Sequence, residues 1–162
     1  MLPRAEAADR AARLLALAIP ALLLGGAYLS QYGFGLYPCE MCWWQRYPHF
    51  AALPLAAFAL VRPPARGAVA LAALAILVSG LIGAFHAGVE YHWWQGLTTC
   101  SGAPAGGGGD PLQAILDAPL VRCDQVQWQM FGISLAGFNF LFSVGGALLV
   151  LLLLRRSARA GS

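Results

Sequence analysis

The stretch "AVALAALAILVSGLIGAF", residues 68–85, contains no charged side chain. As a helix it approaches the ~20 residues needed to cross ~30 Å of hydrocarbon. It belongs to one of four apolar runs of similar length, which cover residues 14–31, 43–61, 68–87 and 131–154. The chain has 162 residues, of which 59% are hydrophobic and only 10% charged, so it is too apolar for an ordinary soluble domain. We predict an all-α fold, a four-helix transmembrane bundle, formed by residues 1–162 as a single membrane domain.

The basic residues predict the orientation of this bundle. The chain has no lysine, and eight of its ten arginines fall in three segments: Arg4, Arg10 and Arg13, then Arg62 and Arg66, then Arg155, Arg156 and Arg159. By the positive-inside rule these segments are cytoplasmic, and so are both termini. A long loop, residues 88–130, then lies on the exported side. The net charge of +3 reports this topology, and no basic groove is present that would indicate nucleic acid binding.

All four cysteines fall on the predicted exported side, where disulfides form and persist. Cys39 and Cys42 form a C-x-x-C pair, a spacing that is more often redox-active or metal-binding than structural. Cys100 and Cys123 lie much farther apart than zinc ligands of one knuckle, and no histidine has knuckle spacing to either pair. The sequence therefore favours paired redox disulfides and predicts no metal site.

The segment between the second pair of cysteines favours a mobile loop. "SGAPAGGGGDP", residues 101–111, is a Gly-rich tether that cannot hold a packed core, and residues 110–120 after it predict a short helix on the membrane surface. A disulfide on such a loop can meet a soluble partner and then return to a disulfide fixed at the membrane. A simple spacer between structural cysteines is the alternative.

The stretch "YPCEMCWWQR", Tyr37–Arg46, combines the dithiol with a positive charge. On a helix, Cys39, Cys42 and Arg46 fall within an arc of ~60°, with the arginine one turn beneath the second sulfur. An arginine inside the bilayer costs a few kcal/mol, so Arg46 either reaches the membrane surface or pairs with an anion. A thiolate at Cys42, or an anion made by reducing a bound ligand, would be stabilised by about 4 kcal/mol at ~4 Å and an effective dielectric constant of ~20.

Further polar residues are predicted at the same depth. His86 and Glu90 lie one turn apart at the outer end of the third apolar helix, and Gln31 ends the first. Their convergence with Arg46 favours a polar pocket near the outer surface, although His86 could instead make only a hydrogen bond within the bundle. Two rows of small residues on the third helix predict close approach of a neighbouring helix.

Four motifs together carry a family resemblance. "PCEMCWWQRYPH" opens the second span, "FHAGVEYHWWQG" closes the third, Cys100 and Cys123 lie in the intervening loop, and "FGISLAGFN" opens the fourth. Over nearly its whole length the chain resembles the disulfide bond formation protein B (DsbB) family. These bacterial inner-membrane proteins reoxidise the periplasmic thiol oxidase DsbA and pass the electrons to quinone.

The resemblance implies a role for each motif. Cys39 and Cys42 would form the disulfide that faces ubiquinone or menaquinone, and Arg46 would polarise a quinone oxygen. Cys100 and Cys123 would form the loop disulfide that a reduced DsbA-like protein attacks first. The residues that would complete the quinone site are Gln31, Glu90 and a histidine, for which His86 is favoured over His92.

We therefore predict a disulfide oxidoreductase, a protein dithiol:quinone oxidoreductase, that supports disulfide bond formation. Its partners would be a periplasmic DsbA-like thioredoxin-fold oxidase, quinone and the lipid bilayer. Its place would be the bacterial cell inner membrane, as a multi-pass protein with its cysteines on the periplasmic side. A quinone reductase similar to the vitamin K epoxide reductases, or a membrane scaffold with structural disulfides, are the alternatives. The sequence leaves open which quinone is used, whether the DsbA partner is general or dedicated, and the oligomeric state.

Overall fold

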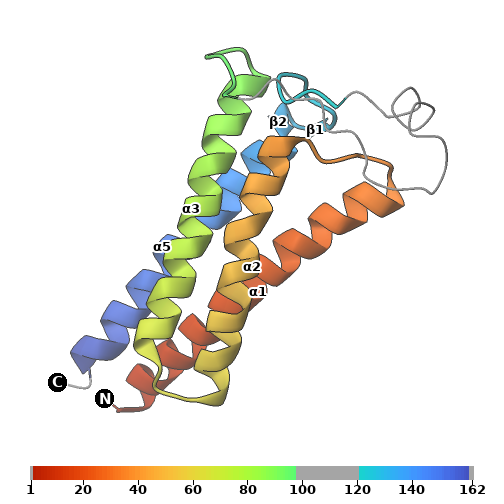
Figure 1. Ribbon diagram of the computed structural model, residues 1–162. Helices are drawn as coiled ribbons and strands as arrows, with labels where there is room; N and C mark the ends of the chain where they lie inside the picture. The colour runs from red at the N-terminus through yellow and green to blue at the C-terminus, as the bar shows by residue number, and fades with distance from the viewer. Residues whose placement is uncertain (1, 98–120, 161–162) are drawn as a thin grey trace.

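Four long helices pack side by side in the computed structural model, which describes residues 2–97 and 121–160. The helices are α1 (Leu2–Gly33), α2 (Glu40–Val61), α3 (Arg66–Glu90) and α5 (Leu135–Ala160). Figure 1 shows both termini at one end of the bundle, which we call the terminal end. We call the opposite end, where α2 begins and α3 ends, the cysteine end. The helical bundle expected from the apolar runs is thus present, while Cys100 and residues 101–120, including the expected surface helix, lie outside the described residues.

Three of the helices are long and apolar enough to cross a membrane, namely α1 over Ala5–Gly33, α3 over its full length, and α5 over Leu135–Arg159. The helix α2 is not among them. Its sequence includes Gln45, Arg46 and His49, all of which are buried inside the protein. The polar character of α2 therefore belongs to the interior of the bundle and not to its outer surface.

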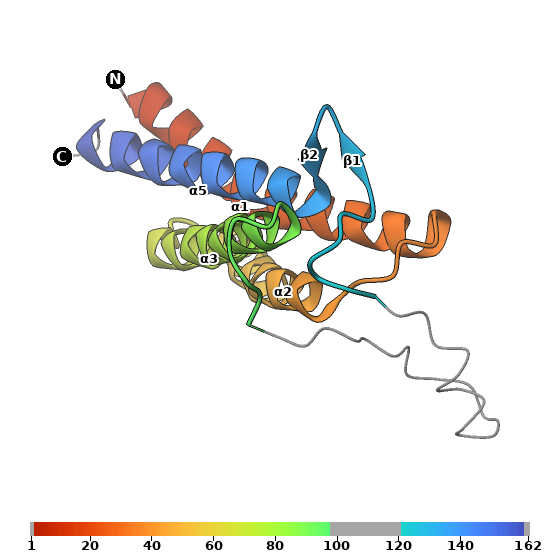
Figure 2. The same cartoon turned by 90° about the horizontal axis from the view of Figure 1, so that it is seen from above.

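The segment before α5 differs from the expected helix. Strands β1 (Gln129–Met130) and β2 (Ile133–Ser134) form a small antiparallel hairpin at the cysteine end, which stands beside the start of α5 in Figure 2. At its tip, Phe131 and Gly132 have φ values of 53° and 76°, in the left-handed region that interrupts a right-handed helix. The helix α5 therefore begins at Leu135, four residues after the approximate start predicted for the fourth span, and the described part of the chain is helical except for this hairpin and the connecting turns.

Ion pairs join the helices at the terminal end. The buried Asp9 side chain of α1 lies 2.9 Å from Arg13 Nη2 and 3.8 Å from Arg66 Nε of α3. Arg66 Nη2 also donates to the carbonyl oxygen of Ser157 in α5, at 3.4 Å. These contacts pair the Asp9 side chain in the part of α1 that precedes the apolar run. They also gather two of the arginines used for the topology prediction at one end.

Glycines on α3 allow α5 to approach closely, as the rows of small residues predicted. A Cβ atom at Gly80 would lie 2.8 Å from Val144 Cγ2 and 2.9 Å from Ser143 Cβ, and one at Gly83 would lie 2.9 Å from the carbonyl oxygen of Ala136. Real side-chain atoms cannot occupy these positions without moving the helices apart. The packing of α3 on α5 therefore depends on the missing side chains.

Gly80→Ala is expected to destabilise the protein by about 1–3 kcal/mol, because the added methyl group overpacks the contact with α5. Gly25→Ala on α1 is the matched control, since a Cβ there would meet no atom within 4 Å. Thermal unfolding of the purified variants in detergent measures the difference. Equal midpoints for the two variants would show that the contact between α3 and α5 tolerates a larger residue.

Candidate active site

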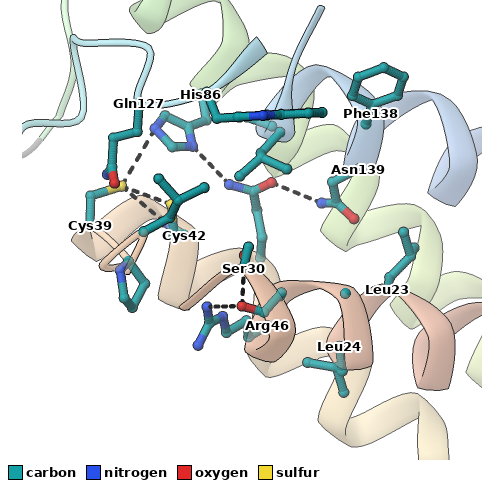
Figure 3. Close-up of a pocket in the computed structure, with 18 of the residues that line it drawn as sticks. Leu23, Leu24, Ser30, Cys39, Cys42, Arg46, His86, Gln127, Phe138 and Asn139 are labelled. Carbon is teal, nitrogen blue, oxygen red and sulfur yellow. Dashed lines mark hydrogen bonds between the residues drawn. The ribbon is translucent and has the colours of Figure 1, made fainter. Parts of the chain in front are cut away.

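A cavity of about 260 Å³ opens between α1, α2, α3 and α5 at the cysteine end. One wall is apolar and comes from α1 and α5, with the residues Leu22, Leu23, Leu24, Leu135, Phe138 and Phe142. The facing wall is polar and comes mainly from α2 and α3, with the residues Cys39, Cys42, Gln45, Arg46, His49, His86 and Glu90. Figure 3 shows the two cysteines and His86 on one side and Leu23 and Leu24 on another. The cavity therefore has apolar side chains on one side and polar groups, including the two cysteines, on another.

The C-x-x-C pair occupies the first turn of α2. Cys39 is the N-cap residue, and its Sγ accepts a hydrogen bond from the backbone N–H of Cys42 at 3.3 Å. Both thiols are free, and their sulfurs are 3.1 Å apart in a hydrogen bond. This bond to Cys42, together with burial, raises the pKa of the Cys39 thiol, so Cys39 holds its proton. A negative charge on the pair therefore belongs on Cys42, at the helix N-terminus and nearer to Arg46.

The sulfur of Cys123 lies beside this pair. Cys123 is 2% exposed and already belongs to a disulfide. Its Sγ, the Sγ of Cys39 and a ring nitrogen of His86 all lie within 4.8 Å of one another. The distances within this cluster of sulfur and nitrogen atoms are short enough for a metal site. A disulfide sulfur, however, lacks the thiolate charge that metal ions bind. The arrangement favours exchange between a thiol and a disulfide.

The orientation of His86 is fixed by Gln45. The amide nitrogen of Gln45 donates to the carbonyl oxygen of Met41 at 3.1 Å and lies 2.9 Å from His86 Nδ1. Since this amide nitrogen is a donor, Nδ1 of His86 accepts, and in the neutral ring the proton is on Nε2. His86 Nε2 lies 3.5 Å from Cys39 Sγ, a contact drawn in Figure 3. His86 can therefore donate to the Cys39 sulfur when negative charge develops on it.

Arg46 is buried and turned toward α1. Its side chain donates to Gln31 Oε1 at 2.7 Å and to the carbonyl oxygen of Ala27 at 3.2 Å. The guanidinium carbon also lies 4.9 Å from the ring centroids of both Tyr28 and Trp43. Because the residue is only 6% exposed, the alternative of a side chain that reaches to the surface does not hold. The structure thus brings together Arg46 and Gln31, although Gln31 itself does not line the cavity.

Glu90 lines the cavity and also fixes the hairpin. Its Oε1 lies 3.9 Å from His86 Nε2, and its Oε2 accepts a short hydrogen bond from the Ser134 hydroxyl. The neighbouring Tyr91 hydroxyl donates to the carbonyl oxygen of Gly132 at 2.9 Å. His92, in contrast, has a φ of 60° and does not line the cavity. Of the two candidate histidines, the structure brings His86 to the cysteines.

Two site residues were not singled out as functional from the sequence. Gln45 connects His86 to Asn139 of α5, whose Nδ2 donates to Gln45 Oε1 at 2.9 Å. His49 then lies 3.1 Å from Asn139 Oδ1 through its Nε2. Asn139 thus makes hydrogen bonds from α5 to α2, and these extend the polar network from the cysteines deep into the bundle. Polar residues within an apolar span were the available signal.

The chain is similar to known proteins over most of its length. The family model for the disulfide bond formation protein DsbB matches residues 9–153. The "Disulfide bond formation protein B" of Verminephrobacter eiseniae is 33% identical over 159 residues, which cover 93% of this chain and 89% of that protein. The protein of the same name from a Polaromonas species is 31% identical over 157 residues, with 93% and 92% covered. No solved structure is significantly similar to the chain. The chain belongs to the DsbB family of membrane-bound disulfide bond formation proteins.

Proposed function

We propose that this protein is a thiol:quinone oxidoreductase of the bacterial inner membrane. In this proposal it reoxidises a periplasmic DsbA-like thiol oxidase and passes the electrons through two cysteine pairs to ubiquinone or menaquinone. The observation that carries the proposal is the approach of the Cys123 and Cys39 sulfurs to within 4.8 Å, beside a cavity that Cys39 and Arg46 both line.

The first half of the reaction moves electrons between sulfurs. A thiolate of the reduced partner attacks Cys100, which breaks its bond to Cys123 and leaves Cys123 as a thiolate. In the oxidised enzyme this thiolate attacks Cys39, forms a Cys39–Cys123 bond and displaces Cys42 as a thiolate. The second partner thiol releases Cys100, which then reforms its bond to Cys123 and leaves Cys39 and Cys42 reduced. The partner loses two electrons and two protons, which the Cys39–Cys42 pair gains.

His86 and Gln45 support the exchange at Cys39. The N–H of His86 Nε2 lies 3.5 Å from the Cys39 sulfur and can stabilise the charge that this sulfur carries when it is attacked or displaced. Gln45 keeps that N–H directed at the sulfur, because its own amide nitrogen occupies His86 Nδ1. His86 therefore acts on the reacting atoms, and Gln45 acts as its positioning residue.

The second half of the reaction takes place in the cavity. The leucine and phenylalanine wall of α1 and α5 fits a flat ring with an apolar tail, and the polar wall fits ring oxygens. When bound, a quinone accepts two electrons and two protons as Cys39 and Cys42 return to a disulfide. Arg46, one turn below Cys42, stabilises the negative charge on the sulfur or on the ring oxygen during this step.

The proposal is tested with purified protein, a reduced DsbA-like protein as electron donor and a short-chain ubiquinone. We expect quinone absorbance to fall by one equivalent for each disulfide formed in the donor. Omission of the enzyme gives the background rate. Oxidation of the donor with no loss of quinone absorbance, or no reaction at all, would refute the proposed function.

The orientation is tested by reporter fusions. Fusions after Arg66 and at the C-terminus are expected to behave as cytoplasmic, and a fusion within residues 106–109 as exported, because of the distribution of arginines. Alkaline phosphatase activity and fluorescent-protein maturation report the two sides. An inverted pattern would place the cysteines in the reducing cytoplasm and contradict the proposal.

A further inference from the structure

The cavity contains a polar group that the mechanism above does not use. His49 lines the cavity from α2, seven residues below Cys42, and is only 3% exposed. Among buried side-chain nitrogen and oxygen atoms of the described residues, its Nδ1 is the one without a hydrogen-bond partner. A buried polar atom without a partner is unfavourable, so its presence calls for a partner from outside the chain.

The surrounding hydrogen bonds fix which nitrogen of His49 carries the proton. Asn139 Nδ2 donates to the carbonyl oxygen of Ser79 at 3.1 Å, and a carbonyl can only accept. The other amide atom of Asn139, Oδ1, is therefore an acceptor, and it lies 3.1 Å from His49 Nε2. This nitrogen must donate, so Nδ1 of the neutral ring carries a lone pair and needs a donor.

His49 is placed to contact the second oxygen of a quinone ring whose first oxygen lies at Cys42. Seven residues of α-helix return to nearly the same face and advance about 10 Å along the axis. A ring with an oxygen at each end can then place one oxygen at Cys42 and Arg46 and the other at His49. An oxidised quinone has only carbonyl oxygens, which cannot donate to Nδ1. Its reduced form has two O–H groups, and each of them can donate.

We propose that Nδ1 of His49 accepts a hydrogen bond from the second O–H of the reduced quinone, so that this residue selects the product over the substrate. The inference rests on the proposed function. In the step itself two thiols lose two electrons and two protons and form the Cys39–Cys42 disulfide. The quinone ring gains the two electrons and the two protons, so each of its oxygens becomes an O–H. His49 keeps its own proton on Nε2, where it continues to donate to Asn139, and stabilises the reduced ring in place.

Two substitutions separate the nitrogens of His49. His49→Gln keeps an amide near the position of Nε2, within reach of Asn139, and loses the acceptor at Nδ1. His49→Asn keeps an amide near the position of Nδ1 and loses the contact with Asn139. The dissociation constants of a short-chain ubiquinone and of its hydroquinone are measured anaerobically by tryptophan fluorescence of the full chain. Thermal unfolding of both variants shows that they are folded.

We expect His49→Gln to weaken hydroquinone binding roughly tenfold and to leave quinone binding nearly unchanged, as for the loss of one hydrogen bond. For a two-electron couple, tenfold is about 30 mV in the midpoint potential of the bound ring. His49→Asn should retain most of the preference for hydroquinone.

Other results overturn the inference. If His49→Asn and not His49→Gln loses hydroquinone binding, His49 acts through Asn139 and not on the ring. Equal weakening of both ring forms in His49→Gln, or no change in either, would likewise exclude a selective contact at Nδ1. If the unsubstituted protein binds neither ring form, the proposed function fails, and this inference fails with it.

Discussion

Cys39→Ser is expected to lower the rate of electron transfer from a reduced DsbA-like partner to quinone by roughly three orders of magnitude or more. A loss of this size is typical when a residue that forms a covalent bond in the reaction is removed. The sulfur of Cys39 lies within 4.8 Å of the Cys123 sulfur, and it is also the hydrogen-bond partner of Cys42. Without it, the loop pair has no disulfide to attack. The loss of quinone absorbance with reduced partner as donor measures the effect.

The same variant should leave the first exchange intact. The partner is expected to reduce the loop disulfide of Cys39→Ser at the normal rate, which trapping of free thiols on a gel can follow. Cys123→Ser is the complementary variant, because it leaves Cys100 as a free thiol, which should attack the disulfide of the oxidised partner and accumulate as a mixed disulfide with it while one partner sulfur leaves as a thiolate. Partner-dependent quinone reduction at the normal rate in Cys39→Ser would show that electrons bypass this cysteine.

Arg46→Ala is expected to lower kcat/KM for quinone by roughly two to three orders of magnitude while thiol exchange with the partner stays normal. A unit charge at ~4 Å contributes about 4 kcal/mol at an effective dielectric constant of ~20, and desolvation reduces this value. The loss corresponds to that net amount, since about 1.4 kcal/mol is tenfold in rate. Steady-state kinetics at varied quinone concentration, with stopped-flow measurement of partner oxidation, separates the two reactions.

Two further arginine variants sharpen this result. Arg46→Lys should rescue only partly, because an ammonium cannot donate in a planar fork to both Gln31 and the Ala27 carbonyl as the guanidinium does. Arg62→Ala removes the same charge from the terminal end and should leave quinone kinetics unchanged. Equal kinetics for Arg46→Ala and Arg62→Ala would mean that the charge beside Cys42 has no part in the reaction.

The helices could be predicted from the sequence better than their ends could. Apolar runs mark the spans because each of these residues is stable in hydrocarbon, whatever its neighbours. The part of α1 that precedes its apolar run instead contains the ion pairs of Asp9 with Arg13 and with Arg66, and Arg66 is distant in sequence. The start of α5 depends on left-handed backbone at Phe131, a residue type that rarely signals such a turn.

The candidate site divides in the same way. Cys39, Cys42 and Arg46 could be grouped from helical periodicity alone, since they share one face of one helix. The contact of His86 with Cys39 and the network through Gln45, Asn139 and His49 join three helices, and their register is set by packing at residues such as Gly80 and Gly83. No local pattern encodes that register, so the unpartnered nitrogen of His49 became visible only in three dimensions.

The contact between the sulfurs of Cys39 and Cys123 is tested most directly by disulfide formation in two double variants, each with two cysteines left. Cys42→Ser with Cys100→Ser retains Cys39 and Cys123, whereas Cys39→Ser with Cys100→Ser retains Cys42 and Cys123. Both are treated with a mild oxidant, and the linked peptides are identified by mass spectrometry. Because Cys39 lies within 4.8 Å of Cys123, we predict rapid and complete formation of the Cys39–Cys123 disulfide, and much slower linkage of Cys42. Preferential linkage of Cys42 to Cys123, or free thiols in both variants, would contradict a relay that passes electrons from Cys123 to Cys39.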